Sequence, residues 1–277
     1  MNTLDIHSRK LEINCARPFV LRVARTLKQR QNAWSLVYDV YREAGYTAPS
    51  TKGLYYSTYD GRPDTLTFTA ERHGHVAATA RIVFDDSCGL PSEKVFPHTA
   101  SKLRKEGRKL CEVGCLVVRK GEPDGVELLK YLFKLAYLAA GPIEHATDML
   151  ITVVPRHAFY YQHGLLFTRL TDPTPNIHVN GEPVVLLHLD LVSAPQRYHE
   201  RYKHFPPSAN LHRFFLHQAS EVAAWIQNNR RALNGAELER VFRNNPALLN
   251  RNATYDVGHS DRPFDPSAQR REKGVSQ

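Results

Sequence analysis

The sequence predicts an α/β fold in which helices flank both faces of a mixed central sheet, followed by a C-terminal helical extension. Three observations lead to this expectation. Runs with two-residue alternation, typical of strands, are interleaved with runs of helical periodicity over residues 18–192. A strand–helix–strand unit at 110–154 predicts a right-handed crossover between two strands of one sheet. From residue 195 onward the apolar patterns are helical, with no further strand.

The N-terminal quarter of the chain predicts one strand and one helix. Residues 1–16 show no clear period, and 18–25 are typical of a short strand. Apolar side chains then recur at helical spacing over 27–44. Thr26 can cap the start of this helix and Gly45 can close its end. A loop rich in Tyr, Ser, Thr, Gly and Pro follows, up to residue 64.

A β-hairpin comes next. Alternating residues from 65 to 84, interrupted by a turn at 72–75, predict two antiparallel strands. Arg81 lies in the middle of the second strand, on its less apolar face. Residues 85–108 are polar and irregular, with short helical stretches near 92–94 and 100–106.

The second half of the core alternates strands and helices. A strand at 110–119 precedes a helix for which Asp124 and Glu127 predict a capping box, and Gly141-Pro142 ends that helix. The remaining elements are a strand at 149–154, a helix at 155–164, a strand at 165–170, a turn at 180–181 and a strand at 184–192.

These patterns divide the chain into three parts. Residues 1–192 form the α/β domain, 193–250 form a helical extension, and 251–277 are polar and expected to be disordered. The extension carries helical patterns at 210–233 and 236–244.

Composition limits the class of protein. The 277 residues include 42% hydrophobic and 23% charged residues, which excludes a largely disordered or collagen-like chain. No apolar run is long enough to span a membrane and no signal core follows the N-terminus, so we expect a cytoplasmic protein with four reduced cysteines. The formal charge is +9, from 37 Lys and Arg against 28 Asp and Glu. This excess indicates an acidic partner: nucleic acid, an anionic membrane, or an acidic protein or cofactor.

Three strings carry a resemblance to a known family. They are A-T-A-R-I-V-F-D-D at 78–86 with G-L-P-S-E-K-V-F-P at 89–97, C-E-V-G-C-L-V-V at 111–118, and P-R-H-A-F-Y-Y-Q-H-G-L at 155–165. Together with the order of elements, they resemble the GCN5-related N-acetyltransferase (GNAT) acyl-CoA N-acyltransferase fold. More narrowly, they are similar to the bacterial N-acyl amino acid synthases and the related acyl-homoserine lactone synthases. The resemblance covers roughly residues 18–192 and leaves the helical extension outside.

Glu112 is the candidate general base. An amine that attacks a thioester must lose a proton, and a strand carboxylate facing the cleft can accept it directly or through one water. Apolar neighbours in the strand, including Val113 and Leu116, can raise its pKa. The resemblance places the family's strand glutamate here. The alternative is that Glu112 is half of a structural ion pair.

Arg81 and Tyr160 complete the candidate catalytic set. Arg81 offers a planar fork for the carboxylate of an amino-acid acceptor, and the resemblance implies an arginine that supports the acidic residues of the site. A plain Arg81–Glu112 structural pair is the alternative, and both can hold. Tyr160 lies four residues before Gly164, where the resemblance implies a tyrosine that protonates the departing thiolate. Its alternative is simple packing, as for Tyr161.

The loop after the Glu-bearing strand bears on the acyl donor. In acetyl-CoA-dependent members of the resembled superfamily, a Gly-rich loop cradles the pyrophosphate with its backbone N–H groups. Here residues 119–125 read R-K-G-E-P-D-G, where Pro123 removes an N–H and Glu122 and Asp124 add negative charge. This loop and the resemblance imply that the acyl-phosphopantetheine co-substrate arrives on acyl carrier protein rather than as CoA.

The same resemblance implies the donor contacts. Val117 and Val118 would offer backbone hydrogen bonds to the pantetheine arm, and Lys120, Gly121 and Gly125 are candidate phosphate contacts. Acyl carrier protein is strongly acidic, which would account for the basic surface of the chain.

Cys115 is a departure from the lactone-synthase pattern. Those enzymes carry an arginine three residues after the strand glutamate, so Cys115 argues against lactone synthesis and against a need for S-adenosylmethionine. Strand alternation puts Cys111 and Cys115 on the face opposite Glu112, unless a bulge intervenes, so we expect a buried thiol.

No metal site is expected. Cys88, His98, Cys111 and Cys115 can be assembled on paper, but no C-x-x-C or H-x-x-x-H spacing supports such a site.

The sequence therefore predicts an enzyme that moves a long-chain fatty acyl group from acyl carrier protein to the α-amine of an amino acid, with no bound cofactor. One alternative is an acyl-homoserine lactone synthase-like or acyl-CoA-dependent N-acetyltransferase. Another is a non-enzymatic basic protein that binds nucleic acid or protein, although no recognition-helix, zinc-finger or RNP signature is present. The helix at 211–233 is expected to pack on the domain or cap the acyl channel, with peripheral membrane contact as its alternative.

Overall fold

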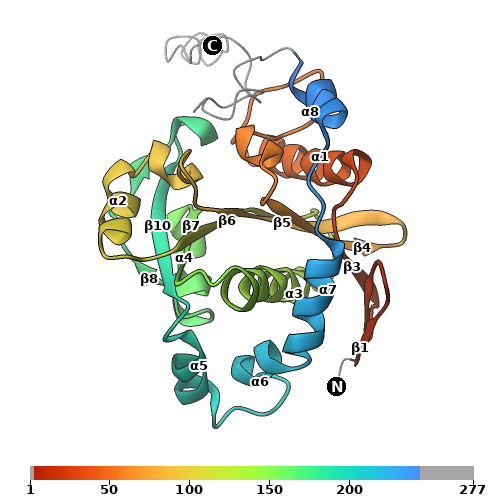
Figure 1. Cartoon of the computed structure of the whole chain (residues 1–277), viewed down its shortest axis with the longest axis vertical. Coiled ribbons are helices and arrows are strands. Elements are labelled where there is room, and N and C mark those ends of the chain that lie inside the picture. The colour runs from red at the N-terminus through yellow and green to blue at the C-terminus, as the bar shows by residue number, and fades with distance from the viewer. Residues whose placement is uncertain (1–2, 244–277) are drawn as a thin grey trace, which may run out of the picture.

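The computed structural model describes residues 3–243, and ten strands within that range form one mixed sheet (Figure 1). Their order is β1-β2-β3-β4-β5-β6-β7-β10-β8, with β9 pairing to β10, and every pair is antiparallel except the parallel pair β6–β7. The strands are β1 Thr3–Ile6, β2 Leu11–Asn14, β3 Phe19–Val23, β4 Leu66–Arg72, β5 His75–Phe84, β6 Leu110–Val118, β7 Asp148–Val153, β8 Thr168–Arg169, β9 Thr174–Pro175 and β10 Pro183–Asp190.

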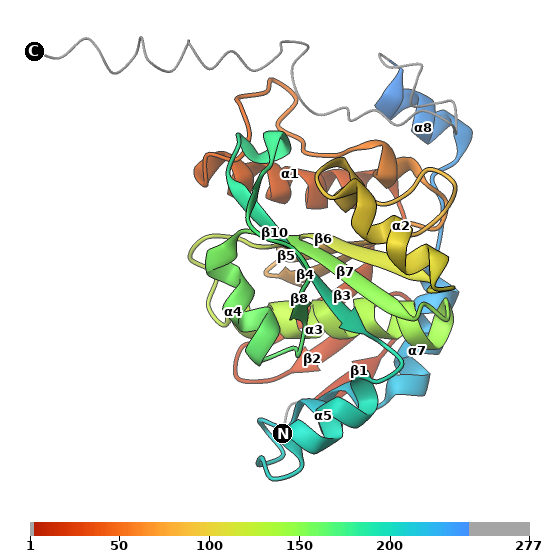
Figure 2. The same cartoon turned by 90° about the vertical axis from the view of Figure 1, so that its left-hand side faces the viewer.

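Helices cover both faces of this sheet, which confirms the fold class expected from the sequence. α1 packs on β4, β5 and β6 from one side, and α3 packs on the same strands from the other (Figures 1 and 2). The helices are α1 Leu27–Glu43, α2 Pro97–Lys105, α3 Gly125–Leu138, α4 Pro155–His163, α5 Ala194–Tyr202, α6 Leu211–Leu216, α7 Ala219–Asn229 and α8 Gly235–Phe242. Short helical turns are η1 Thr58–Gly61, η2 Pro91–Lys94, η3 Ala139–Ile143 and η4 Ile177–Val179.

Local sequence signals explain the start of α1 and the β4–β5 hairpin. Thr26 caps α1 by accepting a hydrogen bond from the Gln29 N–H at 3.2 Å, and the Gln29 side chain accepts one from the Thr26 N–H. In the hairpin, His73 and Gly74 both have positive φ, which is the conformation of a two-residue turn that matches the twist of the strands. Both predictions from the sequence are confirmed.

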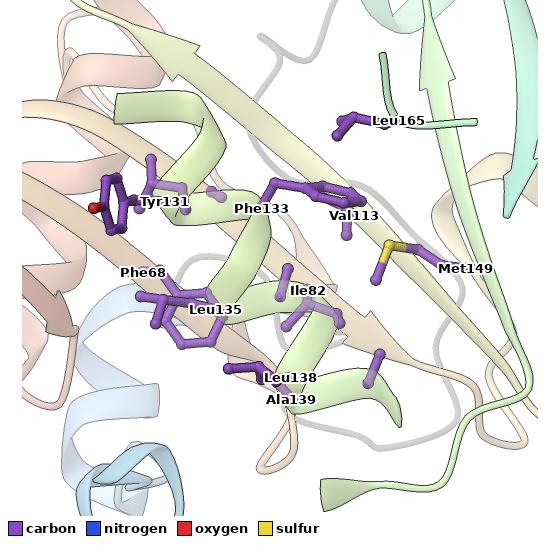
Figure 3. Close-up of a cluster of buried hydrophobic side chains, with 14 of the residues drawn as sticks. Phe68, Ile82, Val113, Tyr131, Phe133, Leu135, Leu138, Ala139, Met149 and Leu165 are labelled. Carbon is purple, nitrogen blue, oxygen red and sulfur yellow. The ribbon is translucent and has the colours of Figure 1, made fainter. Parts of the chain in front are cut away.

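The largest hydrophobic core lies between the sheet and α3 (Figure 3). Phe68, Ile82, Val113 and Met149 project from four neighbouring strands toward α3, whose inner face includes Phe133. The apolar face of α3 is therefore the face that packs on the sheet.

The helices after residue 193 divide between the two sides of the sheet. α5, α6 and α7 lie on the α3 side, and the chain then passes the sheet to place α8 beside α1 (Figure 1). The sequence predicts one helix over 210–233, but the structure has a break at Gln218, whose φ is +50°. Lys134 from α3 reaches into this break and donates to the carbonyl groups of Phe214 at 2.8 Å and His217 at 2.5 Å.

Two further expectations about local structure are wrong, and some elements were not predicted from the sequence. Residues 1–16 contain β1 and β2, whose four-residue length is too short for a visible period. The strand expected at 165–170 is reduced to the two residues of β8. Asp124 has positive φ and no capping bond, because its carboxylate faces Arg17 at 3.3 Å instead of the helix. Helix α5 was not predicted from the sequence, because its buried face consists only of Ala194, Tyr198 and Tyr202.

Two expectations concern membranes and the C-terminus. Within residues 3–243, no helix is both long and apolar enough to cross a membrane. The segment 251–277, for which the sequence predicts disorder, lies outside the described residues.

The core predicts the effect of a truncation in α3. Phe133 is fully buried and its ring meets those of Phe167 and Phe215 edge-on. We expect Phe133→Ala to lower the free energy of unfolding by about 3–5 kcal/mol in urea titrations. The control is Val126, which lies on the same helix and is 65% exposed. Val126→Ala should change the free energy of unfolding by less than about 0.5 kcal/mol. Equal effects of the two substitutions would contradict the packing described here.

Candidate active site

A cavity of about 610 Å³ opens where β6 and β7 separate. The parallel pairing runs from Leu110 and Asp148 to Val113 and Ile151 and ends there, although both strands continue. The cavity walls come from this opening, from β5, and from the tyrosine-rich loop after α1. Its size is typical of a pocket for a small organic ligand.

Glu112 is the buried acid of this cavity, only 4% exposed. Its carboxylate accepts a hydrogen bond from the Ser92 N–H at 2.8 Å and one from the Thr152 hydroxyl at 3.3 Å. Burial raises the pKa of Glu112, while the Ser92 N–H and the positive charge of Arg81 act in the opposite direction. The site therefore holds a carboxylate whose basicity is above that of an exposed glutamate.

Arg81 lies on the neighbouring strand, on the same face of the sheet as Glu112. It pairs across the strands with Gly114, and Val83 pairs with Glu112, so the two charged residues are diagonal neighbours. The ion pair of Arg81 is made with Asp60, at 2.5 Å, and it also donates to the Ser57 hydroxyl at 3.0 Å. Asp60 raises the pKa of Arg81 despite its burial. Arg81 is thus held by a residue other than the glutamate that the sequence suggests.

Asp60 is one of the site residues that were not predicted from the sequence. It is 2% exposed and accepts hydrogen bonds from four groups: Arg81, the Ser57 N–H and hydroxyl, and the Trp34 indole N–H at 3.0 Å. The spacing Ser57-x-x-Asp60, a capping-box pattern within an otherwise irregular loop, is the one local signal for it.

A β-bulge brings Cys115 into the same cavity. Arg81 pairs with Gly114 but Thr79 pairs with Val117, so two residues of β6 oppose one of β5. Cys115 has a φ of +49° at this bulge and lines the cavity together with Glu112. The expected face of Cys115, opposite Glu112, is therefore wrong, whereas Cys111 does lie in the α3-side core.

Of the predicted donor contacts, only two line the cavity; Lys120, Gly121 and Gly125 are not among its lining residues. Tyr160 lines the cavity from α4, half-buried, and burial raises the pKa of its phenol. Val117 and Val118 also line it. Since the Arg119 N–H donates to the Ala77 carbonyl at 2.8 Å, alternation along the strand turns the backbone groups of Val117 toward β5 and those of Val118 toward the opening.

The loop after β6 differs electrostatically from the expectation. Glu122 is buried and binds Arg72 at 2.9 Å, so its charge is neutralised rather than presented to a ligand. The cations of the loop are matched as well: Lys120, although exposed, lies 3.5 Å from Glu43, and Arg119 lies 3.9 Å from Asp39.

The two glycines of this loop have separate structural reasons. Gly121 has a φ of +77°, in the left-handed region that favours glycine. Gly125 begins α3, and a Cβ there would lie 3.2 Å from a methyl group of Val118. Gly125 thus permits the close approach of the helix start to β6.

Among residues 3–243, no three His, Cys, Asp or Glu side chains lie close enough together to hold a metal ion.

The fold and the family to which the chain belongs define the class: this is an N-acyltransferase with a GNAT-type fold. A family model described as "N-acyl amino acid synthase FeeM" matches residues 32–190, more than half of the chain, and the chain belongs to this family.

Several solved structures are similar to the chain. FeeM, an N-acyl amino acid synthase from uncultured soil microbes, is 22% identical with a TM-score of 0.57, over 64% of this chain and 94% of that one. An acyl-CoA N-acyltransferase from Pseudomonas aeruginosa is 18% identical with a TM-score of 0.42, over 67% and 99%. The acyl-homoserine lactone synthase LasI is 15% identical with a TM-score of 0.45, over 62% and 90%. No curated protein matches the chain.

The position of Cys115 predicts a specific chemical sensitivity. Alkylation with iodoacetamide would add a bulky group inside the cavity that Glu112 lines, so we expect acyl transfer to fall in proportion to Cys115 modification, followed by peptide mass spectrometry. Cys115→Ser should retain activity and resist the reagent, and the fully buried Cys111 should remain unmodified in the folded protein. Full activity of a protein alkylated at Cys115 would show that the thiol lies away from the reacting groups.

Proposed function

We propose that this enzyme transfers a long-chain fatty acyl group from acyl carrier protein to the α-amine of an amino acid and releases an N-acyl amino acid. The observation that carries the proposal is Glu112: a buried carboxylate of raised pKa, opening into a cavity at the split of β6 and β7. Such a group is suited to accept a proton from an amine nucleophile.

The reaction needs two proton movements. The amine attacks the thioester carbonyl, a C–N bond forms, and Glu112 accepts the amine proton directly or through one water. The C–S bond then breaks and the thiolate takes a proton from Tyr160. The phenol of Tyr160 is protonated at neutral pH and so is available as a donor, and burial, which raises its pKa, makes it a weaker acid than an exposed tyrosine.

The acceptor carboxylate calls for a cation at the surface of the cavity. Arg81 is bound to Asp60, and we assign it the support of the acidic site rather than the main contact to the acceptor. Lys94 and Arg156 also line the cavity, from η2 and α4. We assign to them the attraction of the amino-acid carboxylate.

The donor arm would lie along the unpaired side of β6. Beyond Val113, β6 has no hydrogen-bonded partner in β7, so its backbone groups on that side are free to bind the amide groups of phosphopantetheine. Val118 faces this side, and we assign the arm to its backbone, while Val117 contributes its side chain to the wall. Gly121, Lys120 and the start of α3 at Gly125 would meet the phosphate.

The carrier is assigned from the loop after β6. Pro123 offers no N–H, and Lys120 and Arg119 each lie beside a carboxylate, which leaves little positive potential for the pyrophosphate and 3′-phosphate of CoA. A carrier-bound arm brings a single phosphodiester. The acyl chain would follow the apolar walls formed by Leu129, Ile151 and Val153.

The central test is the loss of product when Glu112 loses its charge. In a heterologous host, we expect new N-acyl amino acids by lipid mass spectrometry, and for Glu112→Gln a fall in acyl-transfer rate of about 10²- to 10⁴-fold because no base remains. Glu71→Gln is the matched control, since Glu71 is a strand carboxylate bound to Arg22 outside the cavity. A folded Glu112→Gln enzyme with the full rate would exclude Glu112 as the base.

The donor assignment predicts a preference between two thioesters. With matched acyl chains, we expect kcat/KM for the acyl carrier protein thioester to exceed that for the acyl-CoA thioester by at least about tenfold, since only the CoA form needs a pyrophosphate site. Steady-state kinetics with purified donors measures this. Equal kcat/KM values would refute the argument from the loop while leaving the role of Glu112 intact.

A further inference from the structure

A C-terminal segment outside the family-matched region lies against the η1 turn, which contains Asp60. We call residues 230–242, which follow α7 and include α8, the C-terminal strap (Figure 1). We propose that the C-terminal strap is a positioning element of the acyltransferase site: it fixes the η1 turn so that Asp60 holds Arg81 in place beside Glu112. The inference rests on the proposed role of Glu112.

Arg30 is the first link between the strap and η1. It is a buried residue of α1, and its guanidinium donates to the Asp60 carbonyl at 2.9 Å and to the Arg231 carbonyl at 2.8 Å, with a longer bond to the Ala24 carbonyl. The planar guanidinium of Arg30 therefore links the backbone of the strap to the backbone of Asp60, and the carboxylate of Asp60 binds Arg81.

Phe242 is the second link, and it depends on Gly61. A Cβ at Gly61 would lie 2.9 Å from the Phe242 ring and 3.3 Å from Leu238, so α8 rests directly on the backbone of η1. The Phe242 ring also meets Tyr56 edge-on at 5.7 Å, and Tyr56 stacks at a tilt on Trp34. Trp34 in turn donates to the Asp60 carboxylate.

The strap is held in shape and anchored at its start. Asn234 caps α8 through a capping box with Glu237, and Arg231 binds the same Glu237 at 2.8 Å, so these contacts fix the shape of the strap itself. Arg231 also donates to the Arg25 carbonyl at 2.7 Å, next to α1, and Arg230 pairs with Glu144 on the α3 side of the molecule. The start of the strap is therefore anchored on both sides of the sheet, which is what a support for η1 requires.

The consequence for the site follows from the position of Arg81. Asp60 forms the ion pair of Arg81, while Glu112 is a diagonal neighbour of Arg81 on the next strand. If η1 shifts, Arg81 loses its fixed partner, and its charge becomes available to pair with Glu112. A glutamate paired with arginine is a weaker base, so loosening the strap slows proton removal. The donor arm binds along β6, away from η1, and should be unaffected.

The experiment compares Phe242→Ala with Leu216→Ala, an exposed residue of α6 in the same extension. Hydrogen–deuterium exchange of the peptide 54–62 reports on η1 without any activity. We expect this peptide to exchange faster in Phe242→Ala than in the wild type, and at the wild-type rate in Leu216→Ala. For acyl transfer we expect kcat to fall about 10- to 100-fold in Phe242→Ala, with KM for the donor within about twofold of the wild type. Phe242→Leu should recover most of the loss, since it restores an apolar contact to Gly61.

A second comparison separates positioning from general stability. Arg30→Lys keeps the charge but cannot join both carbonyl groups, and we expect the same fall in kcat at temperatures well below its melting point. Unchanged exchange at 54–62 in Phe242→Ala and Arg30→Lys would overturn the proposal, as would faster exchange with an unchanged kcat. If the wild-type chain makes no N-acyl amino acid, the proposed function fails, and the exchange data alone still decide whether the strap holds η1.

Discussion

Strands β6 and β7 stay paired for only four residue positions, and the rest of the site depends on their separation. A parallel pair that continued would bury the backbone of both strands in the sheet. Because the pairing ends at Val113 and Ile151, the sheet opens while its outer strands and the helices on both faces remain packed. Glu112 lies just before the split and Val118 beyond it. In the proposed function, the acid that accepts the amine proton and the backbone that binds the donor arm therefore come from one strand, which sets their spacing.

The opening places two opposite charges on one face of the sheet, and a third residue prevents them from cancelling. Glu112 is stabilised by the Ser92 N–H and the Thr152 hydroxyl rather than by a full ion pair, so burial still raises its pKa. Arg81 is bound by Asp60, whose buried carboxylate accepts hydrogen bonds from four donors, Arg81 included. A buried ion pair of this kind costs desolvation, and its benefit here is the fixed geometry it gives to Arg81.

The sequence predicted the elements whose signals are local and missed those that depend on tertiary contacts. Two-residue alternation was enough to place Arg81 and Glu112 on adjacent strands, and the resemblance to N-acyl amino acid synthases pointed to Glu112 and Tyr160 in what proves to be one cavity. The bulge at Cys115 could not be predicted, because no sequence signal indicates a non-glycine residue at positive φ. Asp60 was missed for another reason: its four donors come from three separate parts of the chain, which only folding brings together.

The C-terminal extension shows how a shared fold can depend on a segment that the family match does not include. The match ends at residue 190, yet Gly61 inside it lacks a side chain where the Phe242 ring lies. The guanidinium of Arg30, which lies just before the matched residues, donates a hydrogen bond to the Arg231 carbonyl. Without the extension, the surface of η1 would expose an apolar cluster that includes Trp34 and Tyr56, and the buried guanidinium of Arg30 would lose an acceptor. Burying a charged group without its acceptors is costly, so η1 and the strap depend on each other for their positions.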